Sequence, residues 1–550
     1  MRNEFQVRLP ILILFCFATV CASAQSFRVQ CPTSTITHPA AASNNAEPAY
    51  TDIAHYTCTV LNGCGGSAGN VGYLVPSSTA NGAIKCQQIS GGDGYSTMAD
   101  GTQIYMFSFG PLSGLADIAS GQPGTEFPNV FNSVAPAPPQ PGDPATTDGA
   151  SDSGSYNPGG LGAFTYNGAI GLTPDVDAIG AGTCTAPCLD GHVDPRQIMD
   201  VGVMNGNIPA PLMAIDEDDE FFLTLTNVGM IMRPDLFEQH TVHFHGYPNA
   251  SSFYDGVPDA SVAINIGGSF TYYYLAPDAG TYFWHCHITP PEHLQMGMVG
   301  QLYVRPRQNR VPSGSYLYAA RQVQDTDPRT ACISANDILC SHPLPAVNTG
   351  FKQGDNGYSK YAYNDGDGST RYDVEYPIQI HGFDPNFHFV GMTFNPEGFV
   401  DMKDKYFLLN GRSYPDTVAA EPQATMSSDG TMHYSQPLNA IINIPAGGRA
   451  LLRISDLDVT EYQSLASLGI PMMVIGYNAK LLRDQSGNNL YYKTNSITLA
   501  GGESLDVILD ASDTSKYQKG QVFYLYTPNL DHLSNDSENF GGLMTEVHIN

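Results

Sequence analysis

Short stretches rich in β-branched and aromatic residues recur along the chain, separated by turn-rich stretches. Clear examples lie at 221–226, 269–274 and 300–304. Helical periodicity is scarce, and 56 glycines and 39 prolines interrupt the apolar stretches. Aromatic and β-branched residues favour pleated strands, whereas glycine and proline mark the turns between them. The pattern predicts an all-β protein built from β-sandwiches.

Changes in composition divide the 550 residues into segments, and this length is typical of several domains. A run at about 134–161 is rich in Pro, Gly, Ser and Asp and predicts a surface insertion. The predicted segments are a signal peptide at 1–24, a cysteine-bearing N-terminal extension at 25–96, a first β domain at 97–306 with its insertion at about 127–195, a polar connector at 307–375 and a second β domain at 376–550.

The N-terminal residues have the pattern of a secretory signal. Two arginines precede an apolar run at 9–20, and the small residues at 22–24 form an A-x-A cleavage site. We expect export to the periplasm or the cell exterior. Lipid attachment at Cys21 is the weaker alternative, because the bulky Val20 precedes this cysteine. No other stretch reaches the roughly 18 apolar residues of a membrane span, so none is predicted.

The cysteines indicate disulfides and one separate thiol. Of 11 cysteines, nine follow the predicted signal, and an even number remains once Cys286 is set aside. An even number in an exported chain is typical of disulfides. Short spacings predict the local pairs Cys184–Cys188 and Cys332–Cys340. Four more cysteines are expected to pair among themselves with open connectivity, namely Cys31, Cys58, Cys64 and Cys86.

The chain is strongly acidic, with a formal net charge of −29 and only 24 Lys and Arg residues. Nucleic acid and anionic membranes are therefore excluded as expected partners, since few cations could neutralise phosphates. A solvated surface is the favoured interpretation, and attraction of metal cations is the alternative. The acidic run at 216–220 is likewise expected to be a solvated turn before a strand.

Two segments, 240–246 and 284–298, carry the most informative side chains. Together they hold six of the 15 histidines, one isolated cysteine and two methionines. Imidazole, thiolate and thioether ligands suit copper, and a single cysteine followed by methionine favours copper over zinc. The sequence predicts copper as cofactor.

Strand geometry separates these ligands into two sets. Successive side chains of a strand point to opposite faces, so Cys286 should point away from His285 and His287. The inner site is predicted to contain His240, Cys286, His293 and Met298. The outer site is predicted to contain His243, His245, His285 and His287.

Two details of the inner site follow from spacing. Met298 lies five residues after His293, the usual step in a blue-copper loop, whereas Met296, the alternative, lies three after it. Cys286 is bonded directly to both neighbouring histidines, so its backbone connects the inner site to the outer one. Copper–thiolate covalency suits such a one-electron relay.

These motifs resemble the multicopper oxidase and copper nitrite reductase superfamily of cupredoxins. Further similar stretches lie at 254–258 and 280–284, and in the second domain at 408–411, 444–449 and 501–507. The resemblance covers most of 100–550. It implies tandem cupredoxin-like Greek-key β-sandwiches preceded by the disulfide-bearing extension.

The resemblance also implies roles for the two sites. The inner set matches the type 1 copper ligands of the family, and the outer set matches half of its type 2/type 3 trinuclear cluster, where O₂ is reduced to water. Asp255 resembles an acid that helps to deliver protons to that cluster.

The chain departs from the family pattern in two places. The loop from Cys286 to His293 is two residues longer than usual, and the chain has two H-x-H pairs where a trinuclear cluster takes four. The second domain can be aligned with the first by placing residues 520–524 on residues 280–284. In this alignment the positions of His285, Cys286 and His287 are taken by Leu525, Tyr526 and Thr527. The position of Met298 is taken by Leu543. The second domain is therefore expected to lack copper ligands.

Copper nitrite reductases complete a type 2 site with one histidine from a neighbouring subunit. By that analogy His381 or His532 could serve, but His243 stands where nitrite reductases have an aspartate. Nitrite reduction is therefore disfavoured.

The favoured function is an exported copper oxidoreductase. A type 1 copper would accept single electrons from a small reductant, such as a phenol or a low-valent metal ion, and pass them to further copper and O₂. Full four-electron chemistry would need ligands from another subunit or protein, and a homotrimer is the usual arrangement in two-domain relatives. The alternative is a blue-copper electron-transfer protein with type 1 copper alone.

Overall fold

A computed structural model shows the architecture of the chain. It describes residues 29–35, 37–39, 41–50, 56–59, 73–76, 82–114, 117–118, 120–132, 172–174, 189–193, 206–230, 232–246, 251–276, 278–325, 340–393, 398–426 and 432–550. The predicted signal peptide and the predicted pair Cys184–Cys188 lie outside these residues.

The first domain is a sandwich of two four-stranded sheets. One sheet has the order β10-β8-β3-β4, with β3 (Ile84–Thr97), β4 (Gln103–Pro111), β8 (Glu220–Asn227) and β10 (Ser269–Leu275). The other has the order β7-β12-β11-β9, with β7 (Met213–Asp216), β9 (His243–His245), β11 (Gly280–His285) and β12 (Val299–Arg305). Phe107, Phe270 and Trp284 are buried in the core between the sheets.

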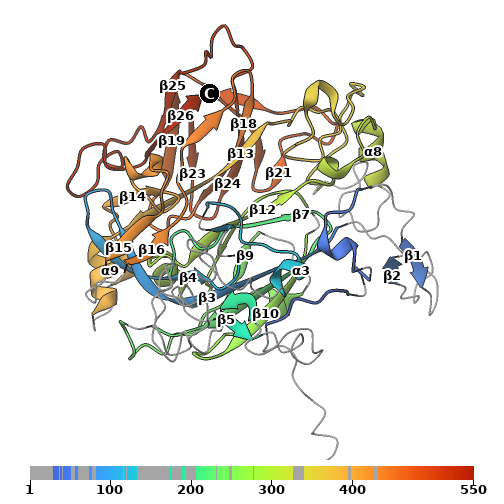
Figure 1. Ribbon diagram of the computed structural model, residues 1–550. Helices are drawn as coiled ribbons and strands as arrows, with labels where there is room; N and C mark the ends of the chain where they lie inside the picture. The colour runs from blue at the N-terminus through green and yellow to red at the C-terminus, as the bar shows by residue number, and fades with distance from the viewer. Residues whose placement is uncertain are drawn as a thin grey trace, which may run out of the picture.

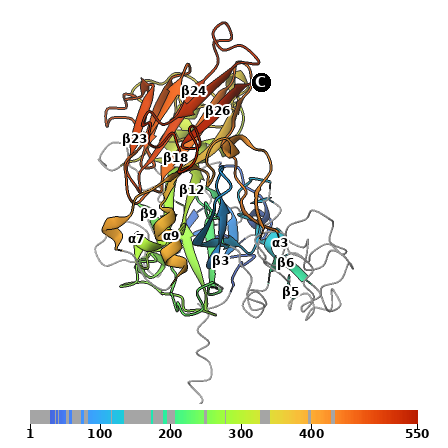
Figure 2. The same cartoon turned by 90° about the vertical axis from the view of Figure 1, so that its left-hand side faces the viewer.

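The second domain is a larger sandwich of the same kind. Its seven-stranded sheet contains β13 (Val374–Phe383), β14 (Tyr406–Leu409), β18 (Arg449–Asp456), β20 (Met472–Tyr477), β21 (Lys480–Leu481), β22 (Tyr492–Thr494) and β24 (Ser504–Asp510). Its five-stranded sheet contains β17 (Ile442–Ile444), β19 (Gln463–Leu468), β23 (Ser496–Leu499), β25 (Val522–Tyr526) and β26 (Met544–Ile549). Figures 1 and 2 show this domain, in orange and red, above the blue and green first domain.

The remaining elements are short. The helices are α3 (Pro128–Phe131), α7 (Pro290–Gln295), α8 (Leu317–Gln324) and α9 (Pro385–Met392). The 3₁₀ turns are η2 (Ser43–Asn45), η4 (Ser252–Tyr254), η5 (Arg307–Arg310), η6 (Asp355–Gly357), η7 (Phe399–Asp401) and η8 (Asp416–Val418). Three two-stranded ladders join β1 (Tyr56–Thr59) to β2 (Tyr73–Pro76), β5 (Leu172–Pro174) to β6 (Leu189–Val193), and β15 (Gln423–Met426) to β16 (Met432–Gln436).

The prediction of an all-β fold built from β-sandwiches is confirmed. Among the described helices, none combines the length and apolarity that crossing a bilayer requires.

A disulfide joins the N-terminal extension to the first domain. Cys31 and Cys86 are bonded, with their Cα atoms 5.8 Å apart, so these two of the four expected cysteines do pair with each other. Cys340 is also disulfide-bonded, and its predicted partner Cys332 lies outside the described residues. Cys286 is a buried free thiol, as its separation from the disulfide set predicted.

The acidic run at 216–220 is buried, and the prediction of a solvated turn is wrong. Each of its five side chains is 8% exposed or less. Arg307 donates to the Asp218 carboxylate through Nε and Nη2 at 2.7 to 3.0 Å, and Arg310 lies 3.2 Å from the same carboxylate. Backbone N–H of Arg307 donates to Glu217 at 2.6 Å. Distant arginines therefore compensate the burial of these acids.

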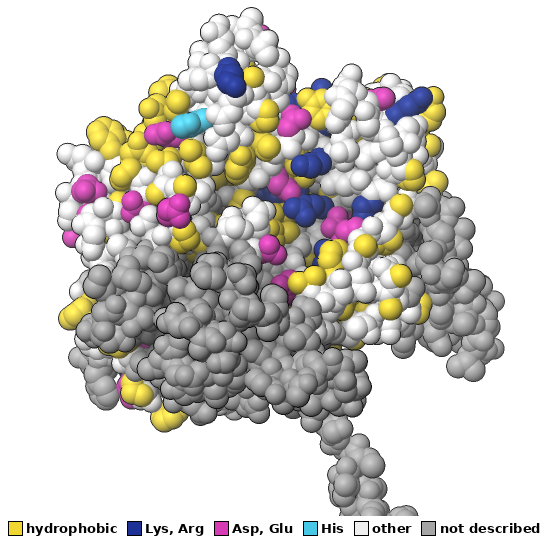
Figure 3. Space-filling model, viewed as in Figure 1, with side chains coloured by type: hydrophobic (Ala, Val, Ile, Leu, Met, Phe, Trp, Pro, Cys, Tyr) yellow, Lys and Arg dark blue, Asp and Glu magenta, His cyan; other side chains and the backbone are white. Residues whose placement is uncertain are grey.

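The two domains meet along the outer face of β11. Phe283 packs there against Phe383, Tyr406 and Leu408 of the second domain. Thr281 Oγ1 donates to Asp506 at 2.7 Å, which adds a polar contact between the domains. Figure 3 shows basic side chains beside acidic ones near the middle of this face of the molecule, where the domains meet. This packing places the end of β11 close to the second domain.

Candidate metal centre

A compact inner cluster lies at the end of β11. The Cys286 thiol lies 3.2 Å from Nδ1 of His293 and 3.9 Å from Nδ1 of His240. One donor atom from each of the three residues lies within 4.8 Å of the others, and all three side chains are fully buried. His240 precedes β9, while His293 is carried by α7. The structure thus brings together three of the four residues predicted for the inner site.

Electrostatics show that this cluster suits a metal. Burial raises the pKa of the Cys286 thiol to about 11 and lowers the pKa of His293 to about 4. Burial also lowers the pKa of His240 well below its usual value. Neutral imidazoles are ready ligands, and a bound cation would stabilise the thiolate that burial disfavours. The donor set, two nitrogens and one thiolate sulfur, fits copper.

The two methionines lie in different surroundings. Both are fully buried in the same core as Cys286. The Met298 carbonyl accepts a hydrogen bond from Cys286 N at 3.1 Å. Met296 lies against α9 of the second domain, where a β-carbon at Gly391 would be 3.2 Å from its Sδ. Met298 thus adjoins Cys286 through the backbone, and its role as the fourth ligand of the inner cluster stays a prediction.

The outer histidines gather on the opposite face of the same strands. Donor atoms of His243, His245 and His285 lie within 4.8 Å of one another. The ring of His287 is centred 5.1 Å from that of His243. Phe244, between His243 and His245, and Trp284, directly before His285, point into the core, as the alternation along each strand requires.

Backbone carbonyls orient two of these rings. Nδ1 of His243 lies 2.7 Å from the Asp255 carbonyl oxygen, and Nδ1 of His285 lies 2.7 Å from that of Cys286. An N–H at each Nδ1 donates to the carbonyl, which leaves Nε2 as the ligand atom. Burial lowers the pKa of His285 to about 3, so its ring is neutral. The Asp255 carboxylate lies 3.5 Å from His243 Nδ1, behind the ring.

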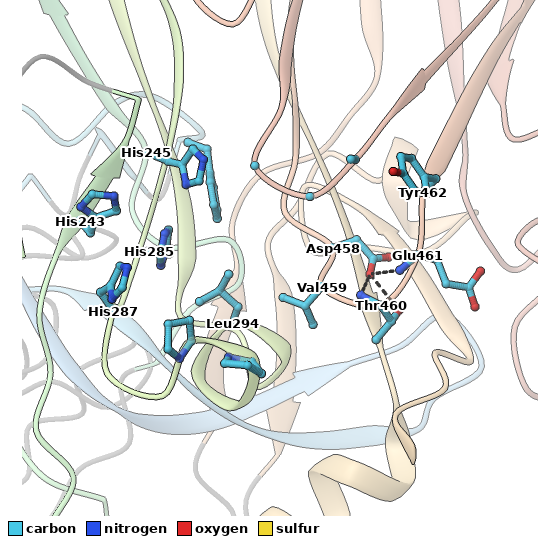
Figure 4. Close-up of a pocket in the computed structure, with 16 residues that line it drawn as sticks. His243, His245, His285, His287, Leu294, Asp458, Val459, Thr460, Glu461 and Tyr462 are labelled. Carbon is cyan, nitrogen blue, oxygen red and sulfur yellow. Dashed lines mark hydrogen bonds between the residues drawn. The ribbon is translucent and has the colours of Figure 1, made fainter. Parts of the chain in front are cut away.

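A cavity of about 550 Å³ separates the outer histidines from the second domain. Figure 4 shows the histidines on one side and residues 458–462 on the other, with Leu294 and Val459 between them. The Asp458 carboxylate accepts from Gln463 Nε2 at 2.6 Å, and Glu461 contacts His532 at 2.8 Å. The described wall of the second domain therefore presents no histidine to the cavity.

His381 and His532 do not line this cavity. His381 is buried beside Phe383, and His532 stacks on Phe407 with ring centroids 4.0 Å apart. Within one chain, neither ring therefore faces the outer histidines.

The register of the second domain corrects one detail of the sequence comparison. Thr527 N donates to Leu543 O, as Cys286 N donates to Met298 O. Thr527, rather than Tyr526, therefore occupies the position of Cys286, one residue later than the sequence suggested. The reason is that Leu525 is buried in its domain core, as Trp284 is in the first domain. None of these residues is a copper ligand.

Sequence reasoning missed the second-domain wall of the cavity. Gly502 approaches the histidines so closely that a β-carbon there would lie 3.2 Å from His245 Nε2. Val459 lines the same space. The G-G pair at 501–502 was visible in the sequence, but nothing local indicated that it faces a histidine.

Comparison with known proteins finds similarity in the segment that carries both clusters. A family model described as multicopper oxidase matches residues 190–309. A laccase of Aspergillus fumigatus is 34% identical over 109 residues, covering 20% of this chain and 17% of the laccase. The multicopper oxidase MmcO of Mycobacterium tuberculosis is 31% identical over 133 residues, covering 22% and 25%. A copper-containing nitrite reductase of Rhizobium meliloti is 34% identical over 109 residues, covering 19% and 26%.

The matched region thus spans 26% or less of the length of each of these relatives. Among solved structures, a blue copper oxidase from Nitrosomonas europaea has a TM-score of 0.40 at 21% identity, covering 63% of this chain and 78% of that one. A laccase from Botrytis aclada has a TM-score of 0.37 at 14% identity, covering 63% and 48%. The family match falls on the segment that holds both histidine clusters and Cys286, so it is this segment that is similar to multicopper oxidases and to a copper-containing nitrite reductase.

Proposed function

We propose that the protein is an exported copper oxidoreductase that takes single electrons from a small reductant and passes them to O₂. The observation that carries this proposal is the position of Cys286. Its thiol belongs to the inner cluster, while the adjacent His285 belongs to the outer one. One stretch of backbone therefore connects two metal sites.

The inner cluster is the electron-accepting site in this proposal. Its proposed type 1 ligands are His240, Cys286, His293 and Met298. Copper bound there would supply one-electron redox chemistry. The Glu238 carboxylate lies 3.8 Å from Nε2 of His293, and its side chain is 30% exposed. A phenol or a low-valent metal ion could therefore approach the buried site from this side.

The outer cluster is the proposed electron-delivering site. His243, His245, His285 and His287 would hold one or more further coppers, and Asp255, behind the ring of His243, would help to supply protons. The chain's own second domain forms one wall of the cavity beside these histidines. We propose that these four histidines hold further copper within one chain, and that ligands for full four-electron reduction of O₂ come from another subunit or protein.

Copper stoichiometry tests this proposal. We expect at least two coppers per chain, a blue absorption band, a type 2 EPR signal and steady O₂ uptake with a phenolic reductant. The second candidate is an electron-transfer protein, which is favoured by the lack of histidines on the described second-domain wall. One copper with a blue band and no O₂ uptake would establish that candidate instead.

Two substitutions separate the sites. His287→Ala should abolish O₂ uptake while the blue band persists, because only an outer ligand is lost. Cys286→Ser should abolish the blue band, because the thiolate is lost. Unchanged O₂ uptake in His287→Ala would contradict the oxidase proposal.

A further inference from the structure

A third group of metal-ligating side chains lies at the far end of β11 from both histidine clusters. Its members are Glu217 in the turn between β7 and β8, Asp278 just before β11, and His342 in the connector. One donor atom from each lies within 4.8 Å of the other two. A strand rises about 3.3 Å per residue, so roughly 20 Å separates Asp278 from His285. This junction cluster is therefore distinct from the proposed copper sites.

The junction cluster is buried and contains a neutral imidazole. Glu217 is fully buried and His342 is 2% exposed. Burial lowers the pKa of His342 to about 4, so the ring is uncharged at neutral pH and keeps a nitrogen lone pair for a ligand. Its Nδ1 lies 4.0 Å from Oδ1 of Asp278, whose side chain is 17% exposed. A cation could enter along this accessible side of Asp278.

Two buried polar atoms of the junction cluster lack hydrogen bonds. Among the described residues, nothing hydrogen-bonds to Nε2 of His342 or to Oδ1 of Asp278. The backbone of Ala279 hydrogen-bonds to the His342 ring, and Arg321 donates to the His342 carbonyl at 2.6 Å, so the residue is held in place. Buried polar atoms are nearly always paired. The two unpaired atoms therefore point to a ligand.

The surrounding charges favour a cation as this ligand. Within the described part of the chain, the one ion-pair contact of Asp278 is with the neutral His342. Glu217 shares Arg307 with Asp218, and the guanidinium lies 2.7 Å from Asp218 but 3.6 Å from Glu217. Burial raises the pKa of Glu217, although Arg307 opposes this effect. A bound cation would neutralise the carboxylates that the fold brings together here.

The donor atoms restrict the kind of cation. Ca²⁺ and Mg²⁺ prefer oxygen ligands, so the imidazole disfavours them. The three members of the junction cluster include no thiolate or thioether, the ligands that select Cu⁺. Zn²⁺ is bound by imidazole nitrogen and carboxylate oxygen, and three protein ligands leave its fourth position for water. The set of one imidazole and two carboxylates therefore suits Zn²⁺.

We propose that Glu217, Asp278 and His342 bind one Zn²⁺ ion, which ties the connector to the first domain at the start of β11. The ion has a structural role, because it joins segments that are far apart in the sequence. A metal that binds only the folded chain stabilises the fold. The inference does not rest on the proposed oxidase function, since its ligands belong to neither histidine cluster.

The test counts zinc and copper by elemental analysis in copper-loaded, full-length protein that has been dialysed against Zn²⁺. We expect one zinc per chain, a higher Tm with zinc, and an unchanged copper content and blue band. Asp278→Asn keeps the size of the side chain but removes its charge, and should weaken zinc binding by about tenfold or more. Asp531→Asn, at an exposed acid of the second domain, is the matched control and should bind zinc normally.

A second variant removes the imidazole. His342→Asn should lose the zinc and its effect on Tm while the blue band persists. The blue band reports that the first domain is folded, so loss of zinc with an intact band assigns the loss to the junction cluster. No zinc in the unaltered protein, or one zinc per chain retained in both variants, would overturn the inference. Zinc bound in this way by a protein without O₂ uptake would overturn the proposed function alone.

Discussion

Gly91 of β3 lies directly against the ring of His240. A β-carbon at this position would lie 2.6 Å from Cδ2 of the ring. His240 is fully buried, so the ring cannot move without disturbing its neighbours. We expect Gly91→Ala to displace the imidazole, shift the visible and EPR spectra of the copper-loaded protein, and cost about 1–3 kcal/mol in free energy of unfolding. Spectra and chemical unfolding of the variant measure both effects.

Gly398→Ala is the control for this substitution. The nearest atom to its β-carbon would be a carboxylate oxygen of the flexible Asp401 side chain, at 3.1 Å. The visible and EPR spectra of the copper-loaded Gly398→Ala variant should equal those of the unaltered protein. An unchanged blue band in Gly91→Ala would show that His240 is not a copper ligand.

The side-chain directions at both clusters could be predicted from sequence, because alternation along a strand is a local property. Phe244 and Trp284 point into the core, and the histidines next to them in sequence therefore point outward. In the second domain, the strand that corresponds to β11 has no metal-ligand motif from which its register could be read. Its alignment was therefore wrong by one residue at Thr527, a position that only the hydrogen-bonding register reveals.

Helix α7 is held in place from the second domain by Gln295. Gln295 Nε2 donates to Asp404 at 2.9 Å, and its Oε1 accepts from Asp384 N at 3.0 Å. Because α7 also carries His293, these contacts position a proposed copper ligand. We expect Gln295→Leu to leave buried polar groups unpaired, reduce the free energy of unfolding by about 1–3 kcal/mol and broaden the type 1 EPR signal. Urea unfolding and EPR provide the measurements.

Gln518→Leu, at an exposed turn, is the control and should change neither quantity. A sharp, unaltered type 1 signal in Gln295→Leu, despite lost stability, would limit the role of Gln295 to stability alone.

At the scale of elements, the acidic turn between β7 and β8 shows where sequence reasoning reached its limit. Five acidic residues in a row are usually solvated. Here Arg307 and Arg310, about 90 residues later in the chain, compensate Asp218 inside the fold. Charge patterning considers only neighbours in sequence, so it could not predict this pairing.

At the scale of the molecule, the packing of the domains determines what the outer histidines face. The sequence predicted two sandwiches and an outward four-histidine set. It could not predict that Val459 and Gly502 would line the opposite side of the space in front of them, because more than 200 residues separate these positions from His245. Contacts of such long range depend on how Phe283 and Leu408 bring the two outer faces together.

An ion pair between the domains gives the last prediction. Glu375 receives hydrogen bonds from Arg305 at the end of β12 and from Arg453 in β18, both within 3.0 Å. Burial alone would raise the pKa of Glu375, but the two arginines lower it to about 2, from a usual 4.5. A lowered carboxyl pKa stabilises the fold above the usual value, and this contribution is lost as pH falls from 4.5 towards 2. Glu375→Gln should therefore reduce the free energy of unfolding by about 3 kcal/mol at neutral pH and by about half as much near pH 3. Urea unfolding at the two pH values measures this difference, with Glu546→Gln, beside the partly exposed His548, as the control. A cost that does not depend on pH would mean that Glu375 acts through packing and not through its charge.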